Sequence, residues 1–306
     1  MKKLILALAV SGLYAINTTS AFATGLVAIP ATGFSESAYT LCNTTGNFGS
    51  SVSTTPTTTA NNTCTVFPAN EAISPVAGYT LIASVSRSAV IGGVTIGTVS
   101  DRVWRNAAQN SCIFGARFTA ASADWDAGTA GTQYFEVNDI ARGGFGNLSV
   151  NAGYFMQAAS ASPVYRIGRT FTSVQHRAHV YNGSAGDKLL PGANYLSLPI
   201  IGGALTLAIN GETSSVWPAS TTAAKQSAAI NANWIDFTLE SVYLENYDLS
   251  SSLVSPMVYV EAACDSSNVN SWAKSGAIRL RQTGQEGEGL VEISIDGFAP
   301  PGAVLP

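Results

Sequence analysis

Short apolar segments separated by turn residues fill the chain after about residue 75. In the clearest of them, Leu290 to Asp296, the apolar Val291, Ile293 and Ile295 alternate with polar or acidic residues. This two-residue period is typical of a half-buried strand, and Asp296-Gly297 then supplies a turn. Similar segments predict strands at 80–85, 90–99, 113–118, 132–137, 148–155, 164–174, 195–201, 205–209, 234–244, 257–262 and 277–281. We therefore expect an all-β fold, a disulfide-stabilised β-sandwich or jelly roll of antiparallel sheets.

Helical patterns are sparse, so we expect at most one short helix. Residues 220–231 (STTAAKQSAAIN) are compatible with a helix whose N-cap is Ser220, just after Pro218. A surface loop of small residues explains the same segment equally well. We assign residues 76–306 to the sandwich core and residues 24–75 to an N-terminal extension.

The first residues have the pattern of a secretory signal peptide. Basic Lys2 and Lys3 precede the apolar run Leu4 to Val10, and Ala21-Phe22-Ala23 offers the small residues that signal peptidase recognises. Cleavage is expected after Ala23, which makes residues 1–23 the signal peptide. No later segment is long and apolar enough for a membrane-spanning helix, so we expect no transmembrane anchor. The mature protein should lie outside the cell or on its surface, with the periplasm as the alternative.

Four cysteines fit an oxidising compartment, and none of them forms a C-x-x-C pair. Cys112 and Cys264 each continue the apolar face of a predicted strand, which favours a bridge between them through the sandwich core. Cys42 and Cys64 are then left to pair with each other. Their bridge would close the Thr-rich segment 44–63, which is too polar to form core and is expected to be an exposed loop.

The charge pattern disfavours nucleic acid as a partner. Lys and Arg number 15 against 19 acidic residues, and no basic cluster interrupts the sequence. Binding to a phosphate backbone depends on clustered cations, which this chain lacks.

No complete catalytic motif is present. There is no G-x-S-x-G, and Ser271-Trp272-Ala273-Lys274 overlaps Lys274-Ser275-Gly276 instead of standing apart from it as two penicillin-enzyme motifs do. The two histidines, His176 and His179, have no third ligand at a telling spacing. Carboxylate pairs with the right chemistry for glycosidic hydrolysis are Glu136 with Asp139, Glu240 with Glu245, and Glu286 with Glu288.

Three groups of residues remain as candidate binding sites. Asp124, Asp126 and Thr129 offer oxygen ligands for a surface-loop Ca²⁺ site, although their spacing fails the EF-hand pattern. Loop-like tryptophans could stack on sugar rings, a role for which core packing is the commoner alternative; they are Trp125, Trp217 and Trp272. The new N-terminus carries Leu26, Val27, Ala28 and Ile29, which could be donated to a neighbour's sheet or form the first strand of their own.

These features favour a non-enzymatic, secreted or cell-surface protein of bacterial type with a structural or adhesive role. Homotypic contacts could build a homo-oligomer or surface polymer, and a glycan or protein is the other expected kind of ligand. The alternative is a secreted carbohydrate-binding module or polysaccharide hydrolase that uses surface tryptophans and carboxylates.

Overall fold

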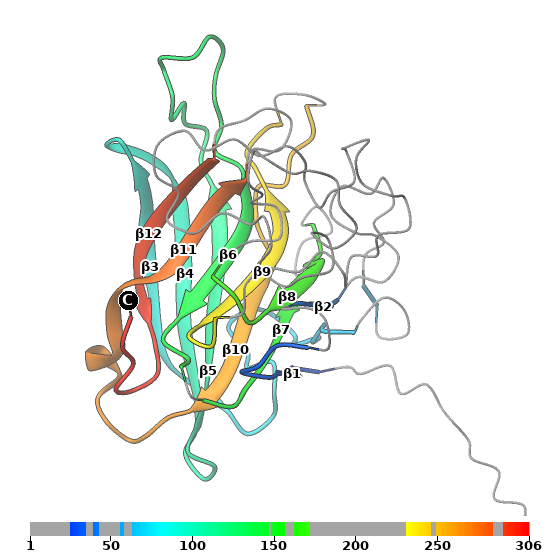
Figure 1. Cartoon of the computed structure of the whole chain (residues 1–306), viewed down its shortest axis with the longest axis vertical. Coiled ribbons are helices and arrows are strands. Elements are labelled where there is room, and N and C mark those ends of the chain that lie inside the picture. The colour runs from blue at the N-terminus through cyan, green and yellow to red at the C-terminus, as the bar shows by residue number, and fades with distance from the viewer. Residues whose placement is uncertain are drawn as a thin grey trace, which may run out of the picture.

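The protein is a sandwich of two six-stranded antiparallel sheets (Figure 1). The computed structural model describes residues 25–34, 39–42, 56–57, 63–146, 148–156, 162–171, 231–245, 249–283 and 290–305. The first sheet has the order β1 (Val27–Ile29), β7 (Val150–Phe155), β10 (Met257–Ala263), β5 (Ser111–Ala120), β4 (Val94–Asn106) and β3 (Thr80–Ile91). The second has the order β12 (Leu290–Phe298), β11 (Ala273–Thr283), β6 (Val137–Gly143), β9 (Trp234–Ser241), β8 (Arg166–Gly168) and β2 (Tyr39–Leu41). The predicted all-β class is confirmed.

One apolar core fills the space between the sheets. Phe114 and Phe118 of β5 are fully buried, and they belong to the same cluster as Ile140, Phe237 and Leu280 of the second sheet. Side chains that alternate along each strand supply this core from both sheets, as the two-residue pattern predicted.

A second, smaller apolar cluster covers the outer face of the first sheet. Trp104 of β4 and Tyr259 of β10 meet edge to face there, with ring centroids 5.7 Å apart. Val66 and Tyr79, from the segment that precedes β3, pack over them. The Trp104 indole N–H donates to the carbonyl of Ala72 at 3.1 Å, so the covering segment is also held by a polar contact.

Several strand boundaries differ from the sequence expectation; within the predicted strand 164–174, for example, β8 spans only Arg166–Gly168. The predicted strand 90–99 is divided by Gly92-Gly93, both with positive φ, which form the hairpin turn between β3 and β4. The predicted strand 132–137 is wrong, because the sixth strand begins only at Val137. Its charged residues, among them Asp139 and Arg142, concealed β6 from a search for apolar runs.

Helices contribute little to the described part of the chain. The single helical element there is a 3-10 turn, Val269–Trp272, and no described helix is long and apolar enough to cross a membrane. The proposed helix at 220–231 and the predicted strands at 195–201 and 205–209 lie outside the described residues, as does the signal peptide at 1–23.

The disulfide pairs are those expected from the sequence, but they join different parts of the fold than expected. Cys112 and Cys264 link neighbouring strands of one sheet, since Cys112 lies opposite Ala262 in the β5–β10 ladder. The Cys42–Cys64 bridge instead connects the two sheets. Cys42 directly follows β2, and the carbonyl of Cys64 accepts a hydrogen bond from Tyr154 of β7. Both bridges indicate an oxidising, extracytoplasmic compartment.

Candidate functional site

The tryptophans expected to bind sugars do not form a shared platform. Trp272 is only 1% exposed; it packs beside Phe114, and its indole N–H donates to Ser267 Oγ at 2.7 Å. Burial on this scale removes Trp272 as a stacking surface, which corrects that expectation. Trp125 is half-buried and meets Phe135 edge to face at 5.9 Å. Trp217 lies outside the described residues.

The proposed Ca²⁺ ligands organise their own loop. Thr129 Oγ1 donates to Asp126 Oδ2 at 2.6 Å, and Asp124 Oδ1 accepts the backbone N–H groups of Asp126 and Gln133, each at 3.2 Å. Among the described residues, no group of three or more His, Cys, Asp or Glu side chains is placed to hold a metal. The loop contacts explain these side chains, and Ca²⁺ binding stays a prediction.

Most of the described carboxylates considered for hydrolysis are buried, and Glu240 is half-buried. Glu136 is 1% exposed and accepts a hydrogen bond from Asn138, while its backbone N–H donates to Gln282. Asp139 is fully buried and Glu245 nearly so. Glu286, Glu288 and both histidines lie outside the described residues. The described members of these pairs therefore do not line an open cleft.

The N-terminal strand forms part of its own sheet. Val27 pairs with Ala152 and Ile29 with Val150, so β1 extends the first sheet beside β7 of the same chain. The structure thus shows the intrachain alternative for residues 26–29, and strand donation has no support from it.

An ionic cluster that the sequence analysis missed connects the two sheets. Asp101 of β4 is fully buried, and its carboxylate accepts hydrogen bonds from Arg87 Nε at 2.9 Å, from Arg142 Nη2 at 3.2 Å and from the Phe298 backbone N–H at 2.8 Å. Arg142 Nη2 also donates to the Phe298 carbonyl at 2.6 Å. One carboxylate therefore ties together strands β3, β4, β6 and β12.

Burial dominates the protonation equilibria of this cluster. It raises the pKa of Asp101, although Arg142, the Phe298 N–H and Arg87 act in the opposite direction. Burial likewise lowers the pKa of Arg142, and Asp101 partly offsets that effect. The group is a structural tie, because without Asp101 the guanidinium of Arg142 would be left in the core without compensation.

A second ionic cluster lies on the opposite face of the second sheet. Arg281 donates to Asp236 Oδ1 and to Glu292 Oε2, both at 2.9 Å, and the Tyr39 hydroxyl donates to Asp236 Oδ2 at 2.8 Å. Burial raises the pKa of Asp236, against the opposing effects of Arg281, Tyr39 and Asp139. For Arg281, burial lowers the pKa, but the carboxylates of Asp236, Glu292 and Asp139 raise it more. The cluster holds strands β2, β9, β11 and β12 together.

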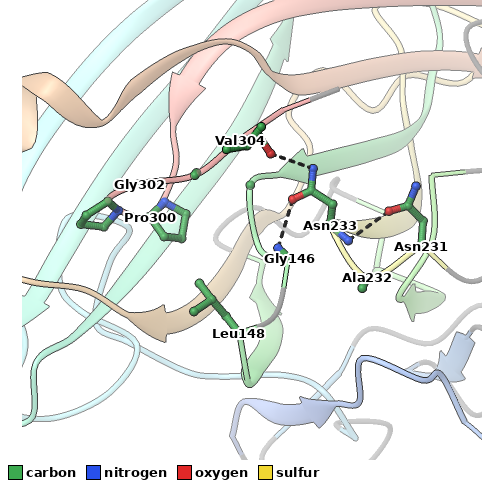
Figure 2. A pocket seen from close by; sticks show the side chains of 11 residues that line it. Gly146, Leu148, Asn231, Ala232, Asn233, Pro300, Gly302 and Val304 are labelled. Atoms are coloured by element: carbon green, nitrogen blue, oxygen red, sulfur yellow. Dashed lines mark hydrogen bonds between the residues drawn. The ribbon is translucent and has the colours of Figure 1, made fainter.

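A pocket of about 540 Å³ opens where the C-terminal segment meets the start of β9 (Figure 2). Its polar side chains are already engaged: Gly146 N–H donates to Asn233 Oδ1 at 3.0 Å, and Asn233 Nδ2 donates to the Val304 carbonyl at 3.2 Å. Asn231 Oδ1 accepts the backbone N–H of Asn233. None of the described residues that line the pocket has a charged side chain.

The edge strand β3 is the most exposed part of the sandwich. It is twelve residues long and pairs only with β4 among the described strands. Four large apolar side chains on it are 38–44% exposed, namely Leu81, Ile82, Val85 and Val90. Its single charged residue, Arg87, is bound to Asp101. An edge strand normally carries charges, Pro or bulges that prevent pairing with another chain. The strand β3 has no Pro and no free charge, and its irregularities in the β3–β4 ladder lie outside the segment from Ala83 to Ala89.

The other sheet edges are protected. The strands β1 and β2 have three residues each, and Pro30 directly follows β1. The fourth edge, β12, exposes Ser294 and the acidic Asp296. The unprotected edge of β3 is therefore the best candidate for an interaction site in the described part of the protein.

Sequence reasoning did not find this edge. The segments 80–85 and 90–99 were both recognised as strands, but exposure and position within a sheet depend on strand order. Comparisons with known protein families, with curated proteins and with solved structures find no match for this chain.

Proposed function

We propose that this is an exported structural or adhesive protein whose sandwich associates with further copies through edge strand β3. The observation that carries the proposal is the long, neutral and partly apolar edge itself. Its unpaired backbone donors and acceptors can add a strand from another chain, and its exposed side chains would lose apolar surface to water in doing so. The two disulfides support a location outside the cytoplasm.

The polar residues on the outer face of β3 agree with this proposal. Ser84, Ser86 and Ser88 lie in line along β3, opposite Arg102, Ser100 and Thr98 of β4. The three serines of β3 are small and neutral, so they neither repel a second copy nor obstruct its approach. The face beside the edge is therefore compatible with continued sheet formation.

The test is the sedimentation of the full exported protein over a wide concentration range. We expect reversible association in the wild type. Val90→Lys should weaken it about fivefold, because a charge replaces an apolar contact at the edge. Val304→Lys is the matched control, since Val304 is more exposed, at 80% against 44% for Val90, but lies in the C-terminal segment. A wild type that stays monomeric at every concentration, or equal effects of the two variants, would overturn the proposal.

A further inference from the structure

The sequence of β3 has approximate two-fold symmetry about Ser86. Reading outward from that residue in both directions, Ser84 matches Ser88, Ala83 matches Ala89, and Ile82 matches Val90. The single exception is the pair Val85 and Arg87. A strand with this symmetry presents the same order of side chains to an antiparallel copy of itself.

We infer that the partner of β3 is the β3 strand of a second copy, paired antiparallel with Ser86 on the two-fold axis. This inference rests on the proposed function and specifies its geometry. The first sheet of one copy and the first sheet of the other would then form one continuous sheet. The contact is isologous, because both copies use the same surface, and the assembly closes as a dimer. Such a dimer would be the building unit of any larger assembly.

The register follows from the way side chains alternate. Ser84, Ser86 and Ser88 lie on the outer face, while Val85 and Arg87 face the core side, opposite Asp101 and Val99 of β4. A two-fold axis perpendicular to the sheet, midway between the two strands, preserves these faces only when a residue of β3 lies directly opposite its own copy. Between Ala83 and Ala89 the β3–β4 ladder has no bulge, so this central segment can extend the sheet regularly.

Neighbouring registers are less favourable. An axis at Arg87 would place Arg87 opposite Arg87 of the second copy, and like charges directly opposite each other destabilise a sheet. An axis at Val85 would place Ala83 opposite Arg87 of the second copy and lose the match between Ala83 and Ala89. With the axis at Ser86, Arg87 instead lies opposite Val85 of the second copy and keeps its contact with Asp101.

Single-cysteine cross-linking tests this register directly. The structure contains no free cysteine among its described residues, and all four cysteines of the chain are in disulfides, so an introduced thiol is the one available for coupling. Ser86→Cys should give a covalent dimer under mild oxidation, because directly opposite residues bring their Cα atoms within disulfide range. Ser84→Cys alone should not, since its two copies would be offset by four residues, about 13 Å along the strand.

Mixing Ser84→Cys with Ser88→Cys should restore cross-linking as a heterodimer, because these positions lie opposite each other in the proposed register. Efficient dimers of Ser84→Cys alone would overturn the inference, as would equal yields from all three variants. Wild type that is monomeric in sedimentation would overturn both the inference and the proposed function. Wild type that associates while Ser86→Cys fails to cross-link would overturn the register alone.

Variants with opposite charges at position 86 provide a second measurement, which does not depend on covalent cross-linking of transient encounters. Ser86→Lys should weaken association about fivefold because two ammonium groups meet at the axis, and Ser86→Glu should do the same with two carboxylates. An equimolar mixture of the two variants should associate at least as tightly as wild type. A mixture that associates no better than either variant alone would contradict the two-fold pairing at Ser86.

Discussion

The edge strands β3 and β12 lie beside each other at one side of the sandwich, yet their exposed surfaces differ (Figure 1). On β12 the apolar Val291, Ile293 and Ile295 face inward, with Ile293 and Ile295 only 5% exposed, and the polar face ends in Asp296. On β3, by contrast, Leu81, Ile82, Val85 and Val90 are 38–44% exposed. A strand that follows the binary pattern strictly is thus protected as an edge, whereas the strand that departs from it is left able to bind.

The same two strands are joined through one buried carboxylate. Asp101 binds Arg87 of β3 and the Phe298 N–H of β12, so the free edge is held in place by a contact inside the core. This contact also keeps the only charge of β3 away from the interface. The difference between the edges therefore has an electrostatic origin as well as an apolar one.

The largest expected effect comes from breaking this tie. Asp101→Ala leaves Arg142 charged and fully buried without its carboxylate, which should lower the free energy of unfolding by about 3–5 kcal/mol. Denaturant unfolding measures the change. In the double variant Asp101→Ala/Arg142→Met, the fully buried guanidinium is removed and only Arg87, whose side chain is 16% exposed, has lost its carboxylate, so part of the loss should be recovered. A loss below about 1 kcal/mol in the single variant would show that Asp101 is not the central tie.

The second-largest expected effect is the dependence of the free energy of unfolding on pH. Because burial raises the pKa of Asp101 in the folded protein, the folded state keeps this proton to higher pH than the unfolded state does. The stabilisation linked to the proton is complete below the ordinary pKa of 3.8 and is lost as pH rises through the raised value. The wild type should therefore lose stability relative to Asp101→Asn as pH rises from the acidic range to neutrality. Denaturant unfolding of wild type and of Asp101→Asn across that pH range measures the difference between their free energies of unfolding. A difference that stays constant, or that changes in the opposite direction, would contradict the raised pKa of Asp101.

The smallest effect is expected when β12 is made to resemble β3. Asp296→Val removes an exposed charge from β12, the edge strand that contacts β3, and should tighten association about twofold, with stability changed by less than about 0.5 kcal/mol. Sedimentation of Asp296→Val and of Asp296→Asn separates the apolar gain from the loss of charge. Weaker association in both variants would indicate that Asp296 contributes a favourable contact.

Local patterns predicted more of the fold than of the interaction site. The alternation in 290–296 and 257–262 located two strands correctly, since each side chain there has one clear environment. The same reasoning failed for β6, where Arg142 is buried because Asp101 of β4 neutralises it. Trp272 was misassigned for the converse reason: its polar neighbours suggested a loop, while its indole ring lies in the core.

The sequence by itself determined the all-β class, because periodicity and turn residues act over a few neighbouring positions. It also favoured the correct cysteine pairs, through the faces on which Cys112 and Cys264 were expected and the elimination that left Cys42 and Cys64. Strand order was decided only by the tertiary structure, and with it which disulfide joins the two sheets, which charges meet at Asp101 and which strand is left at an edge. These features depend on contacts between residues far apart in the chain, which no local pattern specifies.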